Sequence, residues 1–449
     1  MFYTVNSAIS SFIWGVPMLS VFLGTGLFLS AKSGFYQIFG VKDWLGSTMV
    51  SAFRNRNNKA DTNTSVSQFG ALTSALAACL GTGNIVGVAA ALCSGGPGSL
   101  FWMCVSAILG MMTCCCENIL GVKYRRKDKN GIIKGGPMYY IEHGLGMKGL
   151  AVVYAVFLTG ASLGMGNMTQ ANSVASGLSG FGVPPAVTGI MLAVLVAISI
   201  SGGLKRISAV SEKLIPVLSA AFVIACFVII GKNAENIIPC IKSVIKEAFT
   251  VKSLTGFGMA KAMRFGISRG VFSNEAGLGS SAVIHAAADC KNPAEQGKWG
   301  IIEVLIDTVI MCTVTGAAIL TSGIDIVDTS LNGIELCTAV FESVFGKAGG
   351  YFLAVCICLF AFATLIAWSY YGKCGAEYLM GEKIGKVYNL IYIAAAFAGS
   401  IVKFEGVWSL SDTLNGLMAV PNIFALFLLS KEAVGLLREN SDCLHRRRI

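Results

Sequence analysis

Two short polar, glycine-rich segments interrupt apolar runs of the chain and contain residue types suited to binding a small polar ligand. The first is Gly81-Thr82-Gly83-Asn84, and the second is Ser273-Asn274-Glu275-Ala276-Gly277-Leu278-Gly279-Ser280-Ser281. An unwound helix inside a membrane exposes peptide groups, and each unpaired group costs several kcal/mol unless it finds a partner. A bound carboxylate and a bound cation are natural partners. Alternatively, these glycines only permit close helix packing, as Gly160 and Gly164 would; two patches at matching positions make that interpretation weaker.

The composition requires these segments to lie in a membrane protein. Of 449 residues, 54% are hydrophobic and 13% charged, whereas a soluble domain has about 25% charged residues. The mean hydropathy is +0.69. The net charge of +10 comes from basic residues in short loops, so we expect no nucleic-acid partner. The 15 cysteines mostly fall inside apolar runs, which is typical of packing residues and not of disulfides or metal ligands.

A membrane-crossing helix needs about 20 mainly apolar residues, and the sequence predicts about 11 such spans. A leading helix covers about 9–31. Two groups of five follow, at 66–94, 98–120, 149–176, 184–202 and 210–232, and at 267–289, 297–323, 347–372, 386–402 and 405–430.

The distribution of Lys and Arg predicts the orientation, because cytoplasmic loops are enriched in basic residues. With the N-terminus outside, 25 of the 34 Lys and Arg residues fall in cytoplasmic segments. We therefore expect a multi-pass protein of the cell membrane with its N-terminus outside and its C-terminus in the cytoplasm.

Because five is an odd number of crossings, the second group of five helices must run opposite to the first, which is the geometry of an inverted repeat. The predicted fold is an all-α membrane protein with a five-plus-five inverted repeat and one extra N-terminal helix. Its expected parts are 1–65 (extra helix and cytoplasmic loop), 66–232 (first repeat), 233–266 (extracellular loop), 267–430 (second repeat) and 431–449 (basic cytoplasmic tail).

Several motifs along the chain resemble those of one transporter family. They are GTGNIVGVA, GGPGSLFWM, GGPMYYIEHGLG, GNMTQANS, SRGVFSNEAGLGSSAVIHAAA and AWSYYG, in order between about residues 66 and 430. They closely resemble the alanine or glycine:cation symporter family, which is similar in fold to the amino-acid and neurotransmitter:sodium symporters. The resemblance implies coupling to sodium, sometimes to protons, and a small amino acid as substrate.

A zwitterionic substrate needs donors for its carboxylate and acceptors for its ammonium group. Free N–H groups at the start of a half-helix suit the carboxylate, which predicts this role for Thr82, Gly83 and Asn84. Carbonyls near Ser273 and Asn274 can accept from the ammonium. The resemblance also implies that Asn274, Gln170 and Trp368 line the pocket. Alternatively, Trp368 belongs to an interfacial belt and Gln170 only links helices.

The same resemblance implies two sodium sites built from oxygen atoms. One would use the carbonyls of Ala77 and Leu80 with the hydroxyl of Thr364, and the other the carbonyl of Cys79 with the side chain of Asn84. Sodium needs no formal charge among its ligands, so neutral oxygens suffice.

Charged side chains inside spans are functional candidates because burying charge is costly. Asp307 lies near the membrane midplane and is expected to act as a cation ligand, a proton site or a helix–helix acceptor, with Glu303 one turn earlier on the same face. Three further interpretations concern other polar residues of the spans. Glu275 and Arg269 pair or gate the outer entrance, and Glu117 lies near the cytoplasmic face within reach of Arg125 and Arg126. His285 packs by hydrogen bonding or relays protons.

Rival classes have less support in the sequence. A membrane enzyme would need converging catalytic groups, but the chain has no HExxH, and its GLGSS stretch lacks the nucleophile-elbow pattern. A channel usually shows charged rings or repeated filter loops. The chain contains no phosphate-binding loop, so we do not expect it to use ATP. The sequence predicts a symporter that uses sodium, with proton coupling as the alternative.

Overall fold

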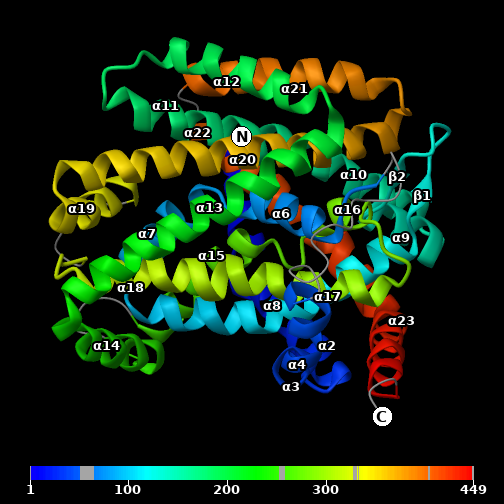
Figure 1. Cartoon of the computed structure of the whole chain (residues 1–449), viewed down its shortest axis with the longest axis horizontal. Helices are drawn as coiled ribbons and strands as arrows, with labels where there is room; N and C mark the ends of the chain where they lie inside the picture. The colour runs from blue at the N-terminus through cyan, green and yellow to red at the C-terminus, as the bar shows by residue number, and fades with distance from the viewer. Residues whose placement is uncertain are drawn as a thin grey trace.

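A computed structural model describes residues 2–50, 65–251, 258–326, 331, 333–402 and 405–446. Most of the helices run along the long axis of the molecule (Figure 1). Helices α14 (Ile237–Phe249) and α19 (Gly333–Phe345) lie at one end. Helix α9 (Pro137–Leu145) and the antiparallel hairpin β1 (Arg126–Lys127) and β2 (Ile133–Lys134) lie at the other end, called the hairpin end below.

The N-terminal region differs from the predicted single helix over 9–31. It forms α1 (Phe2–Ile13) and α2 (Val16–Ser33), which meet at a turn containing Gly15. Pro17 explains the interruption, because proline suits the first turn of a new helix and not a helix interior. The cytoplasmic loop predicted to follow this helix contains α3 (Tyr36–Phe39), α4 (Val41–Leu45) and the π-helix η1 (Gly46–Val50). Residues 51–64 of that loop lie outside the described residues.

The first predicted group of five contains an interrupted helix followed by longer ones. The helix predicted over 66–94 is divided into α6 (Gln68–Cys79), the 3-10 turn η2 (Thr82–Asn84) and α7 (Val86–Gly95). The remaining elements are α8 (Gly98–Lys123), α10 (Lys148–Leu163), η3 (Gly164–Met168), α11 (Thr169–Ser179), α12 (Pro185–Ile200) and α13 (Gly203–Lys232).

The second group starts earlier than predicted. After η4 (Ala234–Asn236) and α14, helix α15 (Met259–Asn274) begins inside the range predicted as an extracellular loop. The following elements are α16 (Ser281–His285), α17 (Pro293–Val304), η5 (Leu305–Cys312), α18 (Thr313–Thr321), α19, α20 (Lys347–Met380), α21 (Ile384–Ile401), α22 (Glu405–Leu417) and α23 (Ala419–Arg446). Helix α23 continues through most of the predicted tail; residues 447–449 lie outside the described part.

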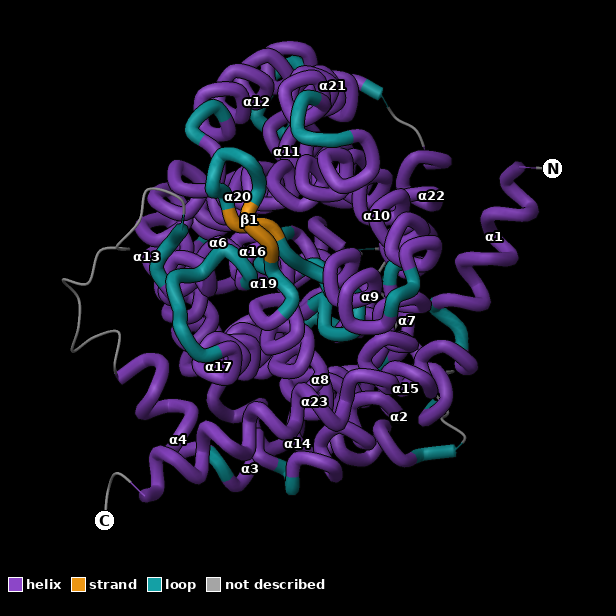
Figure 2. Tube along the Cα trace, turned by 90° about the vertical axis from the view of Figure 1, so that its right-hand side faces the viewer, coloured by secondary structure: helices purple, strands orange, loops and turns teal. Residues whose placement is uncertain are grey.

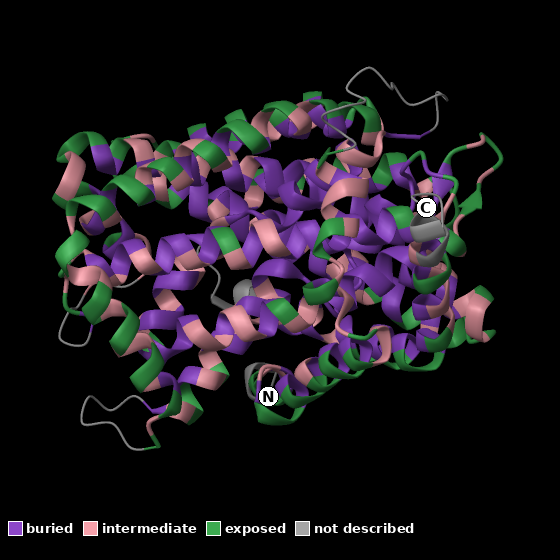
Figure 3. Cartoon of the chain, turned by 60° about the horizontal axis from the view of Figure 1, so that its bottom comes forward, coloured by how far each residue is buried: buried purple, intermediate pink, exposed green. Residues whose placement is uncertain are grey.

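The outer surface of these helices is apolar, as lipid contact requires. Eight helical segments of the described chain are long and apolar enough to cross a membrane. Exposed aliphatic side chains lie along them, among them Val194 and Ile198 of α12 and Val217 and Ile224 of α13. The buried residues lie towards the middle of the molecule (Figure 3). Because soluble proteins rarely expose such large apolar surfaces, this surface identifies a membrane protein.

Helix packing places the interrupted helices at the centre. Helix α8 packs against both α15 and α17, α6 packs against α13 and α20, and α7 packs against α15. Helices α12 and α21 pack together at one side, next to α11 (Figure 2). The two interrupted helices are therefore enclosed by longer, continuous ones.

A buried lysine ties the N-terminal region to α17. Lys298 is fully buried, and its Nζ lies 2.9 Å from Asp43 Oδ2 in α4. The same oxygen accepts hydrogen bonds from Tyr36 (2.5 Å) and from Ser441 of α23 (3.2 Å). Burial acts to raise the pKa of Asp43, but the hydrogen bonds from Tyr36 and Lys298 and the charge of Lys298 outweigh it and lower that pKa.

We expect Asp43→Asn to destabilise the protein by about 2 kcal/mol at pH 7, because it leaves the buried Lys298 charge without its counterion. The measurement is the thermal unfolding midpoint in detergent, with Lys42→Gln as an exposed neighbouring control. Since the pKa of Asp43 is lowered on folding, its contribution persists above the unfolded value of about 3.9 and is lost as pH falls through the folded value. Equal midpoints for wild type and Asp43→Asn at pH 7 would contradict this role.

Candidate functional site

The first interruption lies between α6 and α7, where the sequence predicted it. Helix α6 ends at Cys79, Leu80 and Gly81 leave helical geometry, and the chain makes a 3-10 turn before α7 begins at Val86. The first turn of a helix leaves its N–H groups, and the last turn its C=O groups, without partners in the helix. The predicted interruption of this helix is therefore confirmed.

The second interruption follows Asn274, the last residue of α15. Glu275, Gly277 and Gly279 have φ angles of 56°, 97° and 79°. Glycine adopts positive φ without steric cost, so the spacing of the two glycines explains why the chain unwinds here. The helix resumes as α16, which has only five residues. This gap is also confirmed, although its second half is much shorter than predicted.

Side chains from three other helices bind the free peptide groups of the second gap. Gly277 N donates to Glu117 Oε1 (2.9 Å), Asn422 Nδ2 donates to Gly277 O (2.9 Å), and Tyr154 OH donates to Leu278 O (3.0 Å). Glu117 is fully buried, and Arg125 donates instead to the carbonyls of Ala288 and Cys290, so the predicted contact between Glu117 and Arg125 is wrong. Its carboxylate lies in the gap because it replaces the lost helical partner of an amide.

Asp307 connects the two gaps. Asn84 Nδ2 of η2 donates to Asp307 Oδ1 (2.8 Å), and Ser273 Oγ, one residue before the end of α15, donates to Asp307 Oδ2 (2.8 Å). Thr308 Oγ1 also donates to Oδ2 (2.6 Å). Asp307 is fully buried. In the described part of the chain, the buried Oδ1 of Asn84 has no hydrogen-bond partner, so an oxygen beside this carboxylate is available to a ligand.

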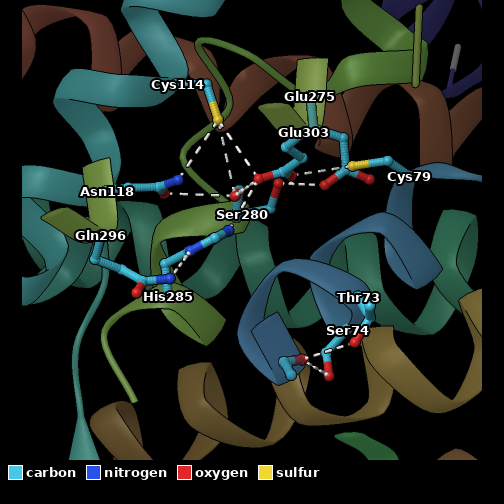
Figure 4. A network of polar contacts seen from close by, with 12 residues as sticks. Thr73, Ser74, Cys79, Cys114, Asn118, Glu275, Ser280, His285, Gln296 and Glu303 are labelled. Atoms are coloured by element: carbon cyan, nitrogen blue, oxygen red, sulfur yellow. Dashed lines mark hydrogen bonds and ion pairs between the residues drawn. The ribbon is translucent and has the colours of Figure 1, made fainter. Parts of the chain in front are cut away.

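Glu303 makes a second connection, one helical turn before Asp307 (Figure 4). Its Oε1 lies 3.6 Å from the Cys79 thiol at the end of α6, and its Oε2 accepts from Ser281 Oγ (2.7 Å) at the start of α16. His285 Nε2 lies 3.0 Å from the same Oε2, and His285 Nδ1 lies 2.6 Å from Gln296 Nε2. With Gln296 as donor, Nδ1 accepts, so Nε2 carries the proton and donates to Glu303.

The residues implied as sodium ligands lie along the first gap. Thr364 Oγ1 is 3.0 Å from the carbonyl oxygen of Ala77, and both residues are buried. The carbonyl oxygen of Cys79 accepts a hydrogen bond from Gly81 N (2.8 Å). Leu80 is also buried. The structure thus brings carbonyl and hydroxyl oxygens close together at the end of α6.

Two of the residues implied to line the pocket, Gln170 and Asn274, lie at different gaps. Gln170 reaches the first gap, where its Oε1 lies 3.4 Å from Thr82 Oγ1. The Asn274 side chain instead completes the second gap, since its Nδ2 donates to Thr308 (3.2 Å) and its Oδ1 accepts from Ala276 N (3.0 Å). Both polar atoms of the Asn274 side chain therefore already have partners within the protein.

Trp368 is fully buried in the middle of the protein, so the interpretation as an interfacial belt residue is wrong. Its ring packs edge-on against Tyr371, with ring centres 5.2 Å apart. It also covers Gly166 of η3 so closely that an added Cβ there would overlap the indole. In the described chain, the indole Nε1 and Glu275 Oε1 form no hydrogen bond of standard geometry, although the Trp368 and Glu275 side chains lie close enough to interact.

The predicted pairing of Glu275 with Arg269 is wrong. The Glu275 carboxylate is fully buried and accepts a hydrogen bond from Ser280. Arg269 points elsewhere: its guanidinium lies 5.6 Å from the centre of the Phe272 ring, and it lines a cavity with Asp412. The left-handed turn at Glu275 redirects its side chain into the gap and away from α15.

The two interrupted helices are also joined by their backbones near the hairpin end. Val66 N donates to Ala287 O (3.2 Å), and Asp289 N donates to Val66 O (2.7 Å). Arg125, next to β1, donates to the carbonyls of Ala288 (2.7 Å) and Cys290 (2.8 Å). The first residues before α6 and the segment after α16 are therefore held together at this end of the molecule.

Two interrupted helices facing each other inside a helical bundle define a class of membrane transporters. The fold agrees: the structure resembles that of MhsT in complex with L-phenylalanine, with a TM-score of 0.56, 12% identity, and coverage of 84% of this chain and 99% of that one. The protein has the fold of the neurotransmitter:sodium symporters.

The sequence gives the family. Residues 1–447 match the sodium:alanine symporter family. The chain is 40% identical to the sodium/alanine symporter AgcS of Methanococcus maripaludis, over 96% of this chain and 95% of that protein. It is 35% identical to the amino-acid carrier protein AlsT of Bacillus subtilis, over 94% of this chain and 89% of that protein. The chain belongs to the sodium:alanine symporter family, and is therefore a sodium-coupled amino-acid symporter and not an enzyme.

Proposed function

We propose that this chain carries a small neutral amino acid, alanine or glycine, together with Na⁺ by alternating access. The observation that supports this most strongly is the connection of both gaps through one buried carboxylate, Asp307, which contacts Asn84 and Ser273. An ion bound there would contact both interrupted helices at once. Its binding would therefore favour one relative arrangement of the two helices.

In this proposal the first gap binds the substrate carboxylate. The peptide N–H groups of Thr82, Gly83 and Asn84 form the first turn after the gap, where amides lack helical partners and the dipole favours negative charge. Gln170, beside Thr82, would orient this turn or contact the substrate directly. Carbonyls of Ser273 and Asn274, in the last turn of α15, would accept from the ammonium group.

Trp368 would limit the size of the substrate side chain. Its ring is buried and fixed between Tyr371 and Gly166, so it cannot move aside for a larger substrate without disturbing its neighbours. A pocket with such a wall favours alanine or glycine. The two differ by one methyl group, worth about 1 kcal/mol.

Two oxygen clusters are proposed for Na⁺ as a transported ion. One consists of the carbonyls of Ala77 and Leu80 with Thr364 Oγ1, and the other of the Cys79 carbonyl and Asn84 Oδ1, with Asp307 adjacent. The unpartnered Asn84 Oδ1 supports the second cluster. The short contact between Thr364 and Ala77 supports the first, because two oxygens that share a hydrogen bond can rearrange around a cation.

We further propose a five-plus-five inverted repeat, with 66–232 and 267–430 as its halves, one extra N-terminal helix, and about 11 spans. The N-terminus would lie outside and the hairpin end in the cytoplasm of a cell membrane. The basic loops support this orientation, as does the position of α14 and α19 opposite the hairpin end (Figure 1).

A protease site appended to the C-terminus should be cleaved in inside-out vesicles and protected in right-side-out ones; the reverse would invert the topology.

Uptake into proteoliposomes tests the substrate and the coupling ion together. We expect labelled alanine or glycine to accumulate under an inward Na⁺ gradient at equal pH and not under a proton gradient without Na⁺. Liposomes without protein are the control. Uptake driven by the proton gradient alone would favour the alternative coupling, and no uptake under either gradient would refute the proposed substrate.

A further inference from the structure

Helix α14 carries exposed apolar side chains along one face, at the end of the molecule opposite the hairpin end (Figure 1). Four of them are each between 49% and 59% exposed and, because a helix turns once every 3.6 residues, lie on the same side of it: Ile238, Ile241, Ile245 and Phe249. They are called the apolar stripe below. The opposite side of the helix is packed, since Ala248 is fully buried. In the described part of the chain, no other segment covers the apolar stripe.

Contacts with neighbouring helices fix the orientation of α14, which packs against α8, α15 and α18. Gly98 of α8 approaches it so closely that an added Cβ would lie 2.5 Å from the backbone nitrogen of Ala248. Trp102 Nε1, also of α8, donates to the carbonyl oxygen of Ala248 (3.0 Å). Beyond the helix, Met259 N at the start of α15 donates to the carbonyl oxygen of Thr250 (2.8 Å). Packing therefore sets the direction in which the apolar stripe faces.

Two exposed lysines border the apolar stripe. Lys242 and Lys246 directly follow Ile241 and Ile245, so each lies about 100° further around the helix than the isoleucine before it. Among the described residues, neither lysine forms a salt bridge. The third charged residue of α14, Glu247, is half-buried, and its Oε2 is inaccessible to solvent. The exposed side of α14 therefore combines an apolar stripe with a positively charged edge.

A phospholipid surface fits both features. A helix with apolar side chains on one side and lysines beside them lies in the headgroup layer of a membrane, where the lysines reach the phosphates. The chain that leads to α14 is already apolar and exposed, as Phe227 and Val228 in the last two turns of α13 show. A second copy of the chain fits less well, because a two-fold contact through the apolar stripe would bring the lysines of both copies together.

We propose that α14 lies in the headgroup layer of the membrane and binds anionic phospholipids, with the apolar stripe among the acyl chains and Lys242 and Lys246 on the phosphates. Zwitterionic phospholipids also carry a phosphate, but their own ammonium group offsets its charge, so the lysines favour an anionic lipid. The interaction concerns a surface away from both gaps and does not depend on which substrate or ion the protein carries. Because α14 is joined to the first residue of α15, the bound lipid also holds the start of α15 at the membrane surface.

Fluorescence quenching by brominated phospholipids in liposomes tests the proposal. Ile241→Trp places a reporter in the apolar stripe, Ile245→Trp is a second reporter one turn along, and wild-type protein gives the signal of the 6 native tryptophans. We expect both reporters to be quenched by brominated phosphatidylcholine, and brominated phosphatidylglycerol to bind beside them at least about threefold more strongly. Lys242→Gln with Lys246→Gln should abolish that preference. Lys347→Gln with Lys386→Gln removes two exposed charges elsewhere and should preserve it.

Three results would overturn the proposal. Reporters that brominated lipids do not quench would place the apolar stripe outside the bilayer. Equal binding of the two lipids, or a preference that persists without both lysines, would remove Lys242 and Lys246 as the phosphate-binding groups. Unquenched reporters in a protein that sediments as a dimer, and that Ile241→Glu converts to a monomer, would identify the apolar stripe as a contact between two copies of the chain.

Discussion

Replacing Gly83 with leucine is expected to abolish Na⁺-driven uptake while the protein still folds and inserts. In the structure a Cβ at Gly83 would meet only Phe272 Cδ1, at 4.0 Å, so the substitution causes no clash within the protein. The leucine side chain would occupy space beside the peptide groups proposed to bind the substrate carboxylate. Losing two charge-assisted hydrogen bonds of about 1.5–3 kcal/mol each lowers binding at least 100-fold.

The measurement is initial uptake in proteoliposomes, with the amount of monodisperse protein as the readout of folding. Gly87→Leu is the matched control: it lies one turn further along, and an added Cβ there has no neighbour within 4 Å. We expect that variant to retain uptake within about twofold. Gly83→Leu protein that transports at the wild-type rate would remove the first gap from the binding site.

Much of the architecture could be predicted from the sequence because membrane insertion imposes simple rules. Length and hydropathy located the helices, and the glycine-rich segments located both gaps. The predicted boundaries failed where a helix continues past the apolar region: α15 begins with Met259-Ala260-Lys261, which is not apolar enough to indicate a span. At α1 and α2 the reverse occurred, since a continuous apolar run conceals a turn at Gly15.

The side-chain partners in the site could not be predicted, because they depend on which helices become neighbours. Arg269 and Glu275 are close in sequence, but the left-handed backbone at Glu275 turns the two side chains apart. Glu117 belongs to a helix end in the sequence, yet packing against α15 and α23 places it inside the second gap. Such contacts join residues more than 150 positions apart.

Glu303 and Asp307 show what a helical pattern does predict. Their spacing of four residues places both carboxylates on one face, and that face lies against both gaps. Glu303 contacts the end of α6 and the start of α16, while Asp307 contacts η2 and the end of α15. One helix therefore links all four half-helix ends, so a change in charge at either carboxylate should affect both gaps together.

Asp307→Asn is expected to raise the half-saturating Na⁺ concentration about 100-fold. The substitution preserves size, and the amide oxygen can still accept from Asn84, while the hydroxyls of Ser273 and Thr308 can rotate to accept from the new NH₂ group. What it removes is the negative charge. A carboxylate within about 4 Å of a cation contributes about 4 kcal/mol at an effective dielectric constant of about 20, and about two thirds of that suffices for the expected change.

The Na⁺ dependence of uptake distinguishes the three roles considered for Asp307. A cation ligand predicts a large rise in half-saturating Na⁺ with the maximal rate little changed. A proton site predicts instead a displaced pH profile at saturating Na⁺. An acceptor that only joins helices predicts a lower melting midpoint with normal Na⁺ dependence.

Thr364→Ala is the comparison at the other oxygen cluster. It removes a neutral ligand, so the half-saturating Na⁺ concentration should rise about threefold to tenfold. Because Asp307 contacts both gaps and Thr364 only the first, equal effects of the two substitutions would argue against a sodium site at Asp307.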